Sequence, residues 1–231
     1  MKRRKSLQEL TIKDNFMFGA VMIQEENCRR FLEIALEMSI DRIEVDKEKS
    51  IVYHPEYKGV RLDVYARDEK NTRYNVEMQI VKRPDLGKRS RYYHSQIDME
   101  LLTTGEGYVT LPDRYVIFVC DFDPFGEGKY CYTFENCCLE NTTLKLKDGC
   151  KSIFLSTCGT NEKEVSDSLV KFLKYIRSGK QEITKEDEFV TKIQKSILQI
   201  KKNREMEEQY MLECGICRKD LQNCTEICTG I

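Results

Sequence analysis

The sequence has only two histidines, His54 and His94, among its 231 residues. Sites that depend on histidine, such as histidine-rich metal centres and Ser-His-Asp triads, are therefore nearly excluded. No apolar run approaches the roughly 18 residues needed to cross a bilayer, and the basic start at residues 1–5 leads into polar residues. We therefore expect a cytoplasmic protein without a membrane partner, in which any hydrolytic chemistry rests on carboxylates.

Acidic and basic residues nearly balance, and the formal net charge is -1 at pH 7. This sum excludes no partner, because binding to nucleic acid depends on where the charges lie. Hydrophobic residues make up 40% of the chain and charged residues 33%, which is an ordinary soluble composition. The eleven cysteines are expected to stay reduced, since no export signal is present.

Apolar residues recur at helical spacing from Asp14 to Met38, which predicts two helices broken near residues 24–27, with Asp14 as an N-cap. Alternation and apolar runs then predict a strand or hairpin over 41–53, strands over 59–66 and 73–81, a helix from 84 to about 103, and a buried central strand over 115–120. Short strands over 130–134 and 151–155 and an amphipathic helix over 162–177 follow. We expect these elements to form one domain that spans residues 1–180.

Residues 181–231 are expected to form a charged helical extension with a Cys-rich tail. A helix over 185–212 carries a narrow apolar stripe that resembles a dimer seam, formed by Phe189, Ile193, Ile197 and Ile200. In the tail, Cys214, Cys217, Cys224 and Cys228 include one C-x-x-C spacing, and four thiolates can hold Zn²⁺. The spacing between the pairs is short for a zinc ribbon, which favours free thiols.

The two strands at 59–66 and 73–81 carry the most informative polar residues. If the hairpin turns about Lys70, residues whose numbers sum to 140 face each other, so Asp63 lies opposite Glu77 with Cβ atoms roughly 4.5 to 5.5 Å apart. Like charges there destabilise a sheet by up to about 1 kcal/mol unless a cation lies between them. Two carboxylates that hold Mg²⁺ are usual where phosphodiesters are cleaved. Gln79 projects to the same side and is a candidate to orient the attacking water or a phosphate oxygen.

Alternation alone equally predicts a bland role for Asp63, Glu77 and Gln79, as the solvated polar face of an edge hairpin. The following helix offers cations and an aromatic side chain for phosphate contact on DNA, namely Lys88, Arg89, Arg91 and Tyr92. A solvated basic face is the alternative for that helix.

Several segments between roughly residues 10 and 178 resemble the PD-(D/E)XK nucleases, in particular the recombination-promoting nuclease and transposase group. They are "TIKDNFMFGAVM", "GVRLDVYARDEKNTRYNVEMQ", "KRSRYYHSQID", "YVIFVCDFDPFG" and "YTFENC". The resemblance implies an α/β fold with a restriction-endonuclease-like core, in which helices flank a central mixed β-sheet. It also implies a Mg²⁺-dependent endonuclease, with Mn²⁺ as a substitute, in which Asp63 matches the first motif aspartate and Glu77 the second acidic residue.

The chain departs from the superfamily pattern at two positions. Leu62 stands where proline often precedes the aspartate, and Gln79 stands where lysine is usual. Because Gln79 carries no charge, a cation has to come from beyond the strand, from Lys82, Lys88 or Arg91, of which Arg91 best matches the "RSRYY" segment. Related nucleases sometimes place an acidic residue of the first helix near the metal, which makes Asp14, Glu25 and Glu26 weaker candidates.

The resulting prediction is a metal-dependent DNA endonuclease that serves transposition or recombination. A catalytically inactive DNA-binding protein on the same fold is the first alternative, since the missing lysine is dispensable for binding. An interaction protein that forms a homodimer through the C-terminal helix is the second.

Overall fold

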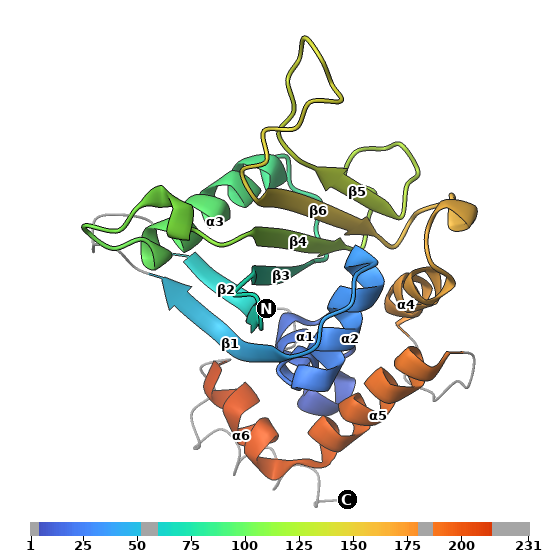
Figure 1. Ribbon diagram of the computed structural model, residues 1–231. Helices are drawn as coiled ribbons and strands as arrows, with labels where there is room; N and C mark the ends of the chain where they lie inside the picture. The colour runs from blue at the N-terminus through green and yellow to red at the C-terminus, as the bar shows by residue number, and fades with distance from the viewer. Residues whose placement is uncertain (1–4, 52–59, 180–186, 214–231) are drawn as a thin grey trace, which may run out of the picture.

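The computed structural model describes residues 5–51, 60–179 and 187–213 (Figure 1). Its centre is a six-stranded mixed sheet in the order β1-β2-β3-β4-β6-β5. The strands are β1 (Ile43–Ile51), β2 (Val60–Asp68), β3 (Arg73–Gln79), β4 (Arg114–Cys120), β5 (Cys131–Phe134) and β6 (Cys150–Ser156). Strands β3, β4 and β6 are parallel, and the other neighbours are antiparallel. The prediction of an α/β fold with a central mixed sheet is therefore confirmed.

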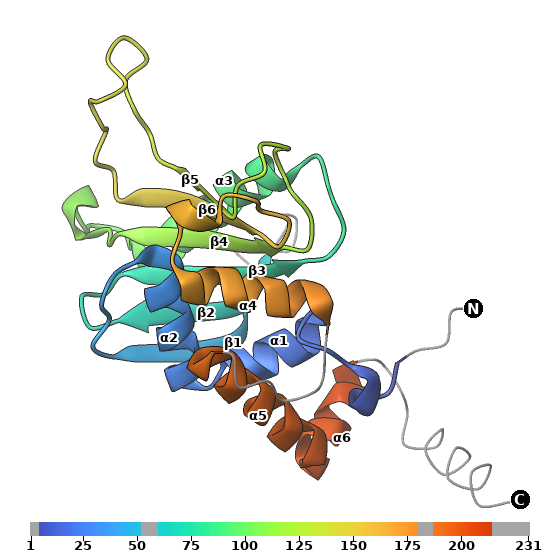
Figure 2. The same cartoon turned by 90° about the vertical axis from the view of Figure 1, so that its right-hand side faces the viewer.

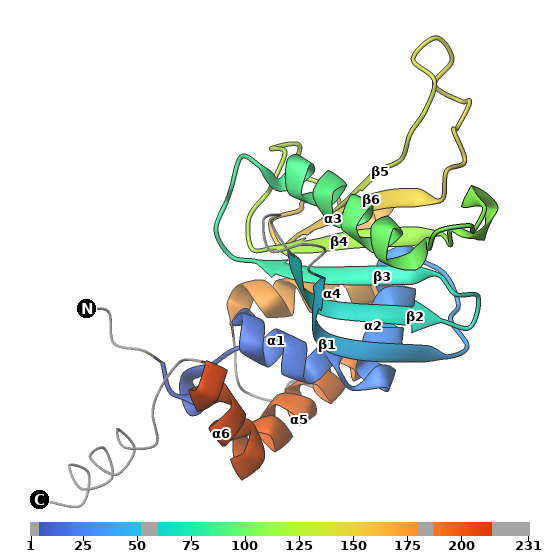
Figure 3. The ribbon, with the colours of Figure 1, turned by 90° about the vertical axis from the view of Figure 1, so that its left-hand side faces the viewer.

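Helices cover both faces of this sheet. They are α1 (Asn15–Met22), α2 (Glu25–Leu36), α3 (Leu86–Leu101), α4 (Asp167–Ser178), α5 (Glu188–Lys202) and α6 (Arg204–Glu213). Helix α3 lies on one face, while α1, α2 and α4 lie on the other with α5 packed beneath them (Figures 2 and 3). The segment between β5 and β6 extends away from this body (Figure 2).

Strand β3 is an interior strand, and its polar side chains are covered by α3. Asn75, Glu77 and Gln79 are only 0%, 2% and 8% exposed. The interpretation of Glu77 and Gln79 as part of the solvated face of an edge hairpin is therefore wrong, while Asp63 is half-buried. Buried polar groups need partners inside the protein, so their contacts carry structural or functional meaning.

The register of the β2–β3 hairpin is the one that the sequence predicts. Val64 faces Val76 and Arg67 faces Arg73, so the residue numbers of each pair sum to 140. The turn is held by Asp68, whose Oδ1 accepts the N–H groups of Lys70 at 2.9 Å and Thr72 at 2.8 Å. Because an Asx side chain can replace the backbone partner in a tight turn, Asp68 fixes the register at the point where the chain reverses.

Three of the predicted strands and helices have clearly different bounds in the structure. Strand β3 stops at Gln79, so Ile80 and Val81 lie outside the sheet. The helix expected over 185–212 is divided into α5 and α6 at Asn203, which is the C-cap of α5. Helix α4 begins only at Asp167, after the Ser166 hydroxyl has capped it by accepting the Leu169 N–H.

Asp14 occupies the N-cap position of α1, as predicted, but its carboxylate does not cap the helix. It turns back to accept the Thr11 N–H at 2.8 Å and pairs with Lys5 at 2.9 Å. The expected contribution of Asp14 to the first turn of the helix is therefore wrong, although its position in the chain is right.

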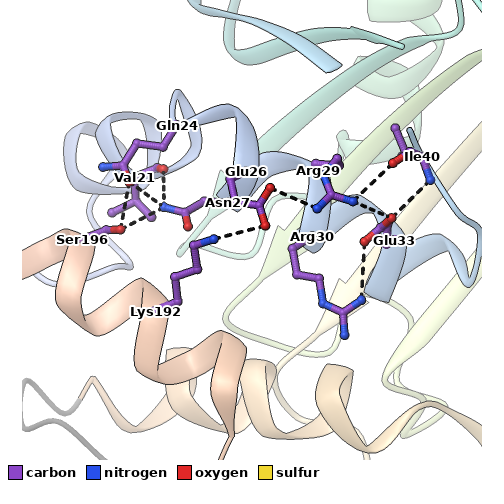
Figure 4. A network of polar contacts seen from close by, with 10 residues as sticks. All are labelled: Val21, Gln24, Glu26, Asn27, Arg29, Arg30, Glu33, Ile40, Lys192 and Ser196. Atoms are coloured by element: carbon purple, nitrogen blue, oxygen red, sulfur yellow. Dashed lines mark hydrogen bonds and ion pairs between the residues drawn. The ribbon is translucent and has the colours of Figure 1, made fainter. Parts of the chain in front are cut away.

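The apolar stripe of α5 is buried within its own chain. Phe189, Ile193, Ile197 and Ile200 belong to the same hydrophobic cluster as the buried residues of α1, α2 and α4. Polar contacts add to this packing, because Asn27 Nδ2 donates to Ser196 Oγ at 3.0 Å and Lys192 pairs with Glu26 at 3.2 Å (Figure 4). The use of this stripe as a dimer seam is thus excluded while α5 is docked, whereas the domain boundary near residue 180 stays a prediction.

Two substitutions test whether α5 folds with the rest of the domain. Ile193 is fully buried, so Ile193→Ala should lower the free energy of unfolding by about 2 to 5 kcal/mol. Leu198 on the same helix is 36% exposed, and Leu198→Ala should cost less than about 1 kcal/mol. Urea unfolding measures both values. Equal small effects would mean that α5 is an independent appendage.

Cysteines in the described ranges carry free thiols, at Cys28, Cys120, Cys131, Cys137, Cys138, Cys150 and Cys158. The four cysteines of the candidate zinc site lie outside those ranges. Within the described part of the chain, no group of three or more His, Cys, Asp or Glu side chains is placed to hold a metal ion. No helix there is long and apolar enough to cross a membrane.

Candidate active site

The β2–β3 ladder ends one position before Asp63 and Glu77 would pair. Its last backbone pair is Val64 with Val76. Beyond that pair, the Asp63 N–H donates to Glu77 Oε1 at 3.2 Å, and the Met78 N–H donates to Asp63 Oδ2 at 3.3 Å. Each carboxylate thus accepts a backbone N–H of the neighbouring strand, which holds the two acidic side chains at one point of the sheet.

Glu77 is the more buried of the two carboxylates. Its Oε1 also accepts from Asn75 Nδ2 at 3.2 Å, and its Oε2 lies 3.5 Å from Arg89 Nη2 and 3.5 Å from the Tyr93 hydroxyl. Burial, followed by the negative charge of Asp63, raises the pKa of Glu77 from its ordinary value of 4.5 to about 8. The negative charge at this point is therefore only partly balanced by the protein.

This imbalance predicts that Asp63→Asn raises the melting temperature of the metal-free protein. Relief of about 1 kcal/mol of like-charge repulsion corresponds to a rise of roughly 2 to 4 °C in a chain of this size. A carboxyl group whose pKa is raised by folding contributes stability at low pH that is lost as the pH rises toward its folded pKa. The rise should therefore be largest near pH 8 and shrink near pH 4.5, where Glu77 is protonated in the wild type.

Thermal unfolding in EDTA at both pH values measures the effect. Asp167, an exposed carboxylate at the start of α4, supplies the control substitution Asp167→Asn, which should leave the melting temperature within about 1 °C at either pH. A lower melting temperature of Asp63→Asn at pH 8 would show that Asp63 stabilises the fold without a metal.

Gln79 orients the guanidinium group of Arg89. Its Oε1 accepts from Arg89 Nη1 at 2.8 Å, and its Nε2 donates to the Met78 carbonyl at 2.9 Å. The Arg89 guanidinium also donates to the Tyr93 hydroxyl at 2.7 Å and lies 5.6 Å from the centre of the Phe118 ring. Hydrogen bonds and ring contacts thus fix the guanidinium beside the Glu77 carboxylate.

The sequence favours Arg91 as the cation beside Gln79, whereas the structure shows Arg89 there. On α3, Leu86, Tyr93 and Ile97 face the sheet, and Arg89 lies on the same side because it is three residues after Leu86 and four before Tyr93. Arg91 is exposed. The spacing of the apolar residues on this helix already indicated that Arg89 faces the sheet. The choice of Arg91 rested instead on its match to the "RSRYY" segment.

The other candidates face solvent or contact other residues. Lys82 Nζ donates to the Asp123 carbonyl at 3.2 Å, Lys88 is exposed, and Tyr92 is half-buried on α3. Glu25 is exposed, and Glu26 is bound by Arg29 and Lys192 on the far side of the sheet (Figure 4).

Sequence reasoning missed an ion pair at the end of the neighbouring strand. Asp121 follows β4 directly, and its N–H donates to the Gln79 carbonyl at 2.9 Å. Its carboxylate pairs with Lys13 at 2.6 Å and accepts from the Thr157 hydroxyl at 3.1 Å. Lys13 belongs to the "TIKDNF" segment, so this segment reaches the carboxyl ends of the parallel strands.

The half-buried Ser152 and the buried His94 do not form a hydrolytic pair. His94 Nε2 lies 3.1 Å from Ser152 Oγ, but Arg114 Nε donates to His94 Nδ1 at 3.2 Å. Nδ1 therefore accepts, and Nε2 must carry the proton, so His94 is unable to accept a proton from Ser152. Burial, with the charge of Arg114, lowers the pKa of His94 to about 4, which keeps the ring neutral.

A family model described as PD-(D/E)XK nuclease family transposase matches residues 13–220. The chain belongs to this family. Comparisons with curated proteins and with solved structures give no match. As a PD-(D/E)XK family member, this chain carries the fold and a nuclease-type or transposase-type function, and the match extends through α5 and α6 rather than ending near residue 178.

In this PD-(D/E)XK chain, the residues that the sequence predicts as the motif are Asp63, Glu77 and Gln79, and the guanidinium of Arg89 is hydrogen-bonded to Gln79. Nucleases of this family typically use divalent metals. The donors at the site suit such an ion, because Mg²⁺ is commonly held by one or two carboxylates while water and phosphate complete its shell. The raised pKa of Glu77 is also consistent with a metal site, because a bound cation would balance the negative charge of the two carboxylates that the protein neutralises only in part.

Proposed function

We propose that this protein is a Mg²⁺-dependent DNA endonuclease, with Mn²⁺ as a substitute, whose strand cleavage serves transposition or recombination. The single observation that carries the proposal is the pairing of Asp63 and Glu77 across the open end of the β2–β3 ladder. Membership of a nuclease family of transposases supports it.

Asp63 and Glu77 are the residues proposed to hold the cation. When bound, the ion supplies charge neutralisation at the phosphate and lowers the pKa of a water molecule. The protein's own contribution is to fix both carboxylates through the N–H groups of Met78 and Asp63, so that little rearrangement is needed.

Arg89 is proposed to donate to a non-bridging oxygen of the phosphate at the cleaved bond. A guanidinium offers several N–H donors in a plane, and two of its nitrogens are already oriented by Gln79 and Tyr93. Gln79 is then proposed to position Arg89. This role replaces the orientation of the attacking water, which the position of Gln79 in the sequence suggested. Lys88, Arg91 and Tyr92 are neighbours of Arg89 on α3 and are proposed to contact phosphates outside the cut.

A plasmid assay tests this function. Supercoiled and linear DNA are incubated with the purified protein in Mg²⁺ and in EDTA, and the products are separated on a gel. Nicked or linear product is expected in Mg²⁺ and its absence in EDTA. Binding without cleavage in Mg²⁺ and in Mn²⁺ would instead favour the catalytically inactive DNA-binding protein.

A further inference from the structure

Two exposed apolar side chains stand directly beside the proposed active site. Ile80 and Val81 follow Gln79 in the chain and are 46% and 67% exposed. Single exposed hydrophobic residues are ordinary on protein surfaces, but a β-branched pair next to a buried polar site is a more specific arrangement. The sequence predicted both residues inside β3, so their exposure is a property of the fold.

The segment that carries them is short and anchored at both ends. At its start, the Gln79 carbonyl accepts the Asp121 N–H, and at its end Leu86 is buried as the first residue of α3. Between these points, Lys82 Nζ donates to the Asp123 carbonyl at 3.2 Å. Because the segment is already fixed, it can present its side chains to a ligand with little loss of conformational entropy.

The surrounding charge indicates which ligand fits. Along the chain, residues 80–91 hold five cationic side chains, Lys82, Arg83, Lys88, Arg89 and Arg91, against the single acidic Asp85, a net charge of +4 for this segment in a chain of net charge -1. Asp121 and Asp123 adjoin the segment, and Lys13 pairs with Asp121. A basic frame around an apolar pair suits a polyanion with apolar faces, which describes the phosphates and bases of DNA. A protein partner would need matching acidic groups around its own apolar patch.

We propose that Ile80 and Val81 insert into the base stack of duplex DNA beside the phosphate that is cut. Apolar side chains wedged between base steps unstack them and bend the duplex, which brings the backbone toward the protein. The substrate class is then duplex DNA that is easily unstacked at the cut, such as a pyrimidine–purine step or a mismatch. The inference rests on the proposed nuclease function and adds a substrate preference to it.

The test uses a short duplex with 2-aminopurine at the proposed insertion step, since this base fluoresces more strongly when it is unstacked. Binding is measured in an Asp63→Ala background in Mg²⁺, so that the DNA stays intact. The test variant is Ile80→Ser with Val81→Ser. The matched control is Tyr108→Ser with Val109→Ser, because these residues are 83% and 94% exposed and precede β4, at the opposite end of the parallel strands.

We expect fluorescence to rise on binding by the Asp63→Ala protein and its control variant, and to stay at the free-duplex level with the test variant. Loss of two apolar contacts should weaken binding about tenfold, which corresponds to about 1.4 kcal/mol. With Asp63 restored, the test variant should cut a matched duplex about tenfold more slowly than the wild type, but a duplex mismatched at that step at nearly the wild-type rate.

Unchanged fluorescence on binding, or a test variant that cuts the matched duplex at the wild-type rate, would overturn the wedge while the nuclease stands. A test variant that binds and cuts DNA like the wild type but differs in self-association would assign Ile80 and Val81 to a protein contact. That result would also overturn the proposed wedge. A wild-type protein that neither binds nor cuts DNA would overturn the proposed function itself.

Discussion

Replacing Asp63 or Glu77 with alanine is expected to reduce Mg²⁺-dependent DNA cleavage by at least about a thousandfold, a loss of roughly 4 kcal/mol of transition-state stabilisation. Each substitution removes one of the two carboxylates at the open end of the ladder and leaves a single carboxylate, which binds a hard cation more weakly and fixes its position less well. The two losses should not add in the double variant, because the carboxylates act as a unit.

The measurement is the initial rate of plasmid nicking, with Mn²⁺ binding followed by calorimetry on the same samples. Asp167→Ala is the matched control, since it removes an exposed carboxylate from α4 and should leave both readings unchanged. Thermal unfolding in EDTA separates loss of the site from loss of the fold. Cleavage that survives in both variants would mean that the chemistry lies elsewhere in the protein.

Substituting Arg89 with alanine is expected to lower kcat by about a hundredfold or more, which is typical when one oriented donor to a developing charge is removed. Arg89→Lys should recover only part of this loss, because an ammonium does not reproduce the planar donors that bond Gln79 and Tyr93. Arg91→Ala provides the contrast. It should weaken DNA binding a few-fold and reduce the salt dependence of binding by about one phosphate contact, with kcat unchanged.

A rescue experiment distinguishes a catalytic Arg89 from a merely structural one. In an Arg89→Ala background, Gln79→Lys returns a cation to the motif position from the strand itself and should restore part of kcat. The lysine adds no packing at the place that Arg89 leaves between Tyr93 and Phe118, so a stability defect would remain. Absence of rescue, together with equal effects of Arg89→Ala and Arg91→Ala, would contradict the assigned role.

The mutual position of Asp63 and Glu77 was predictable because it follows from short-range rules. Side chains alternate along strands, and the Asp68 turn sets which residues face each other, so a spacing of 14 residues translates into a contact between neighbouring strands. The same local reasoning located α1, α2 and the buried strand β4, because hydrophobic periodicity is visible within a single element.

The cation beside Gln79 depends on how α3 docks on the sheet. Because Gln79 carries no charge, the sequence predicts a replacement cation from beyond the strand, but the identity of that cation depends on which side of α3 faces β3. Three basic positions on α3, Lys88, Arg89 and Arg91, satisfy the composition equally well. The packing of Leu86, Tyr93 and Ile97 against the sheet selects Arg89 among them.

The sequence by itself determined the pairing of β2 with β3, the facing positions of Asp63 and Glu77, and the family. These features rest on alternation, turn chemistry and motif residues that lie close together in the chain. Only the tertiary structure decided that Arg89 meets Gln79, that Ile80 and Val81 lie outside the sheet, and that the α5 stripe is covered by its own chain. The physical reason is that a periodic pattern identifies an apolar face but not the surface that will cover it. That surface is supplied by residues distant in sequence, which become neighbours only when the chain folds.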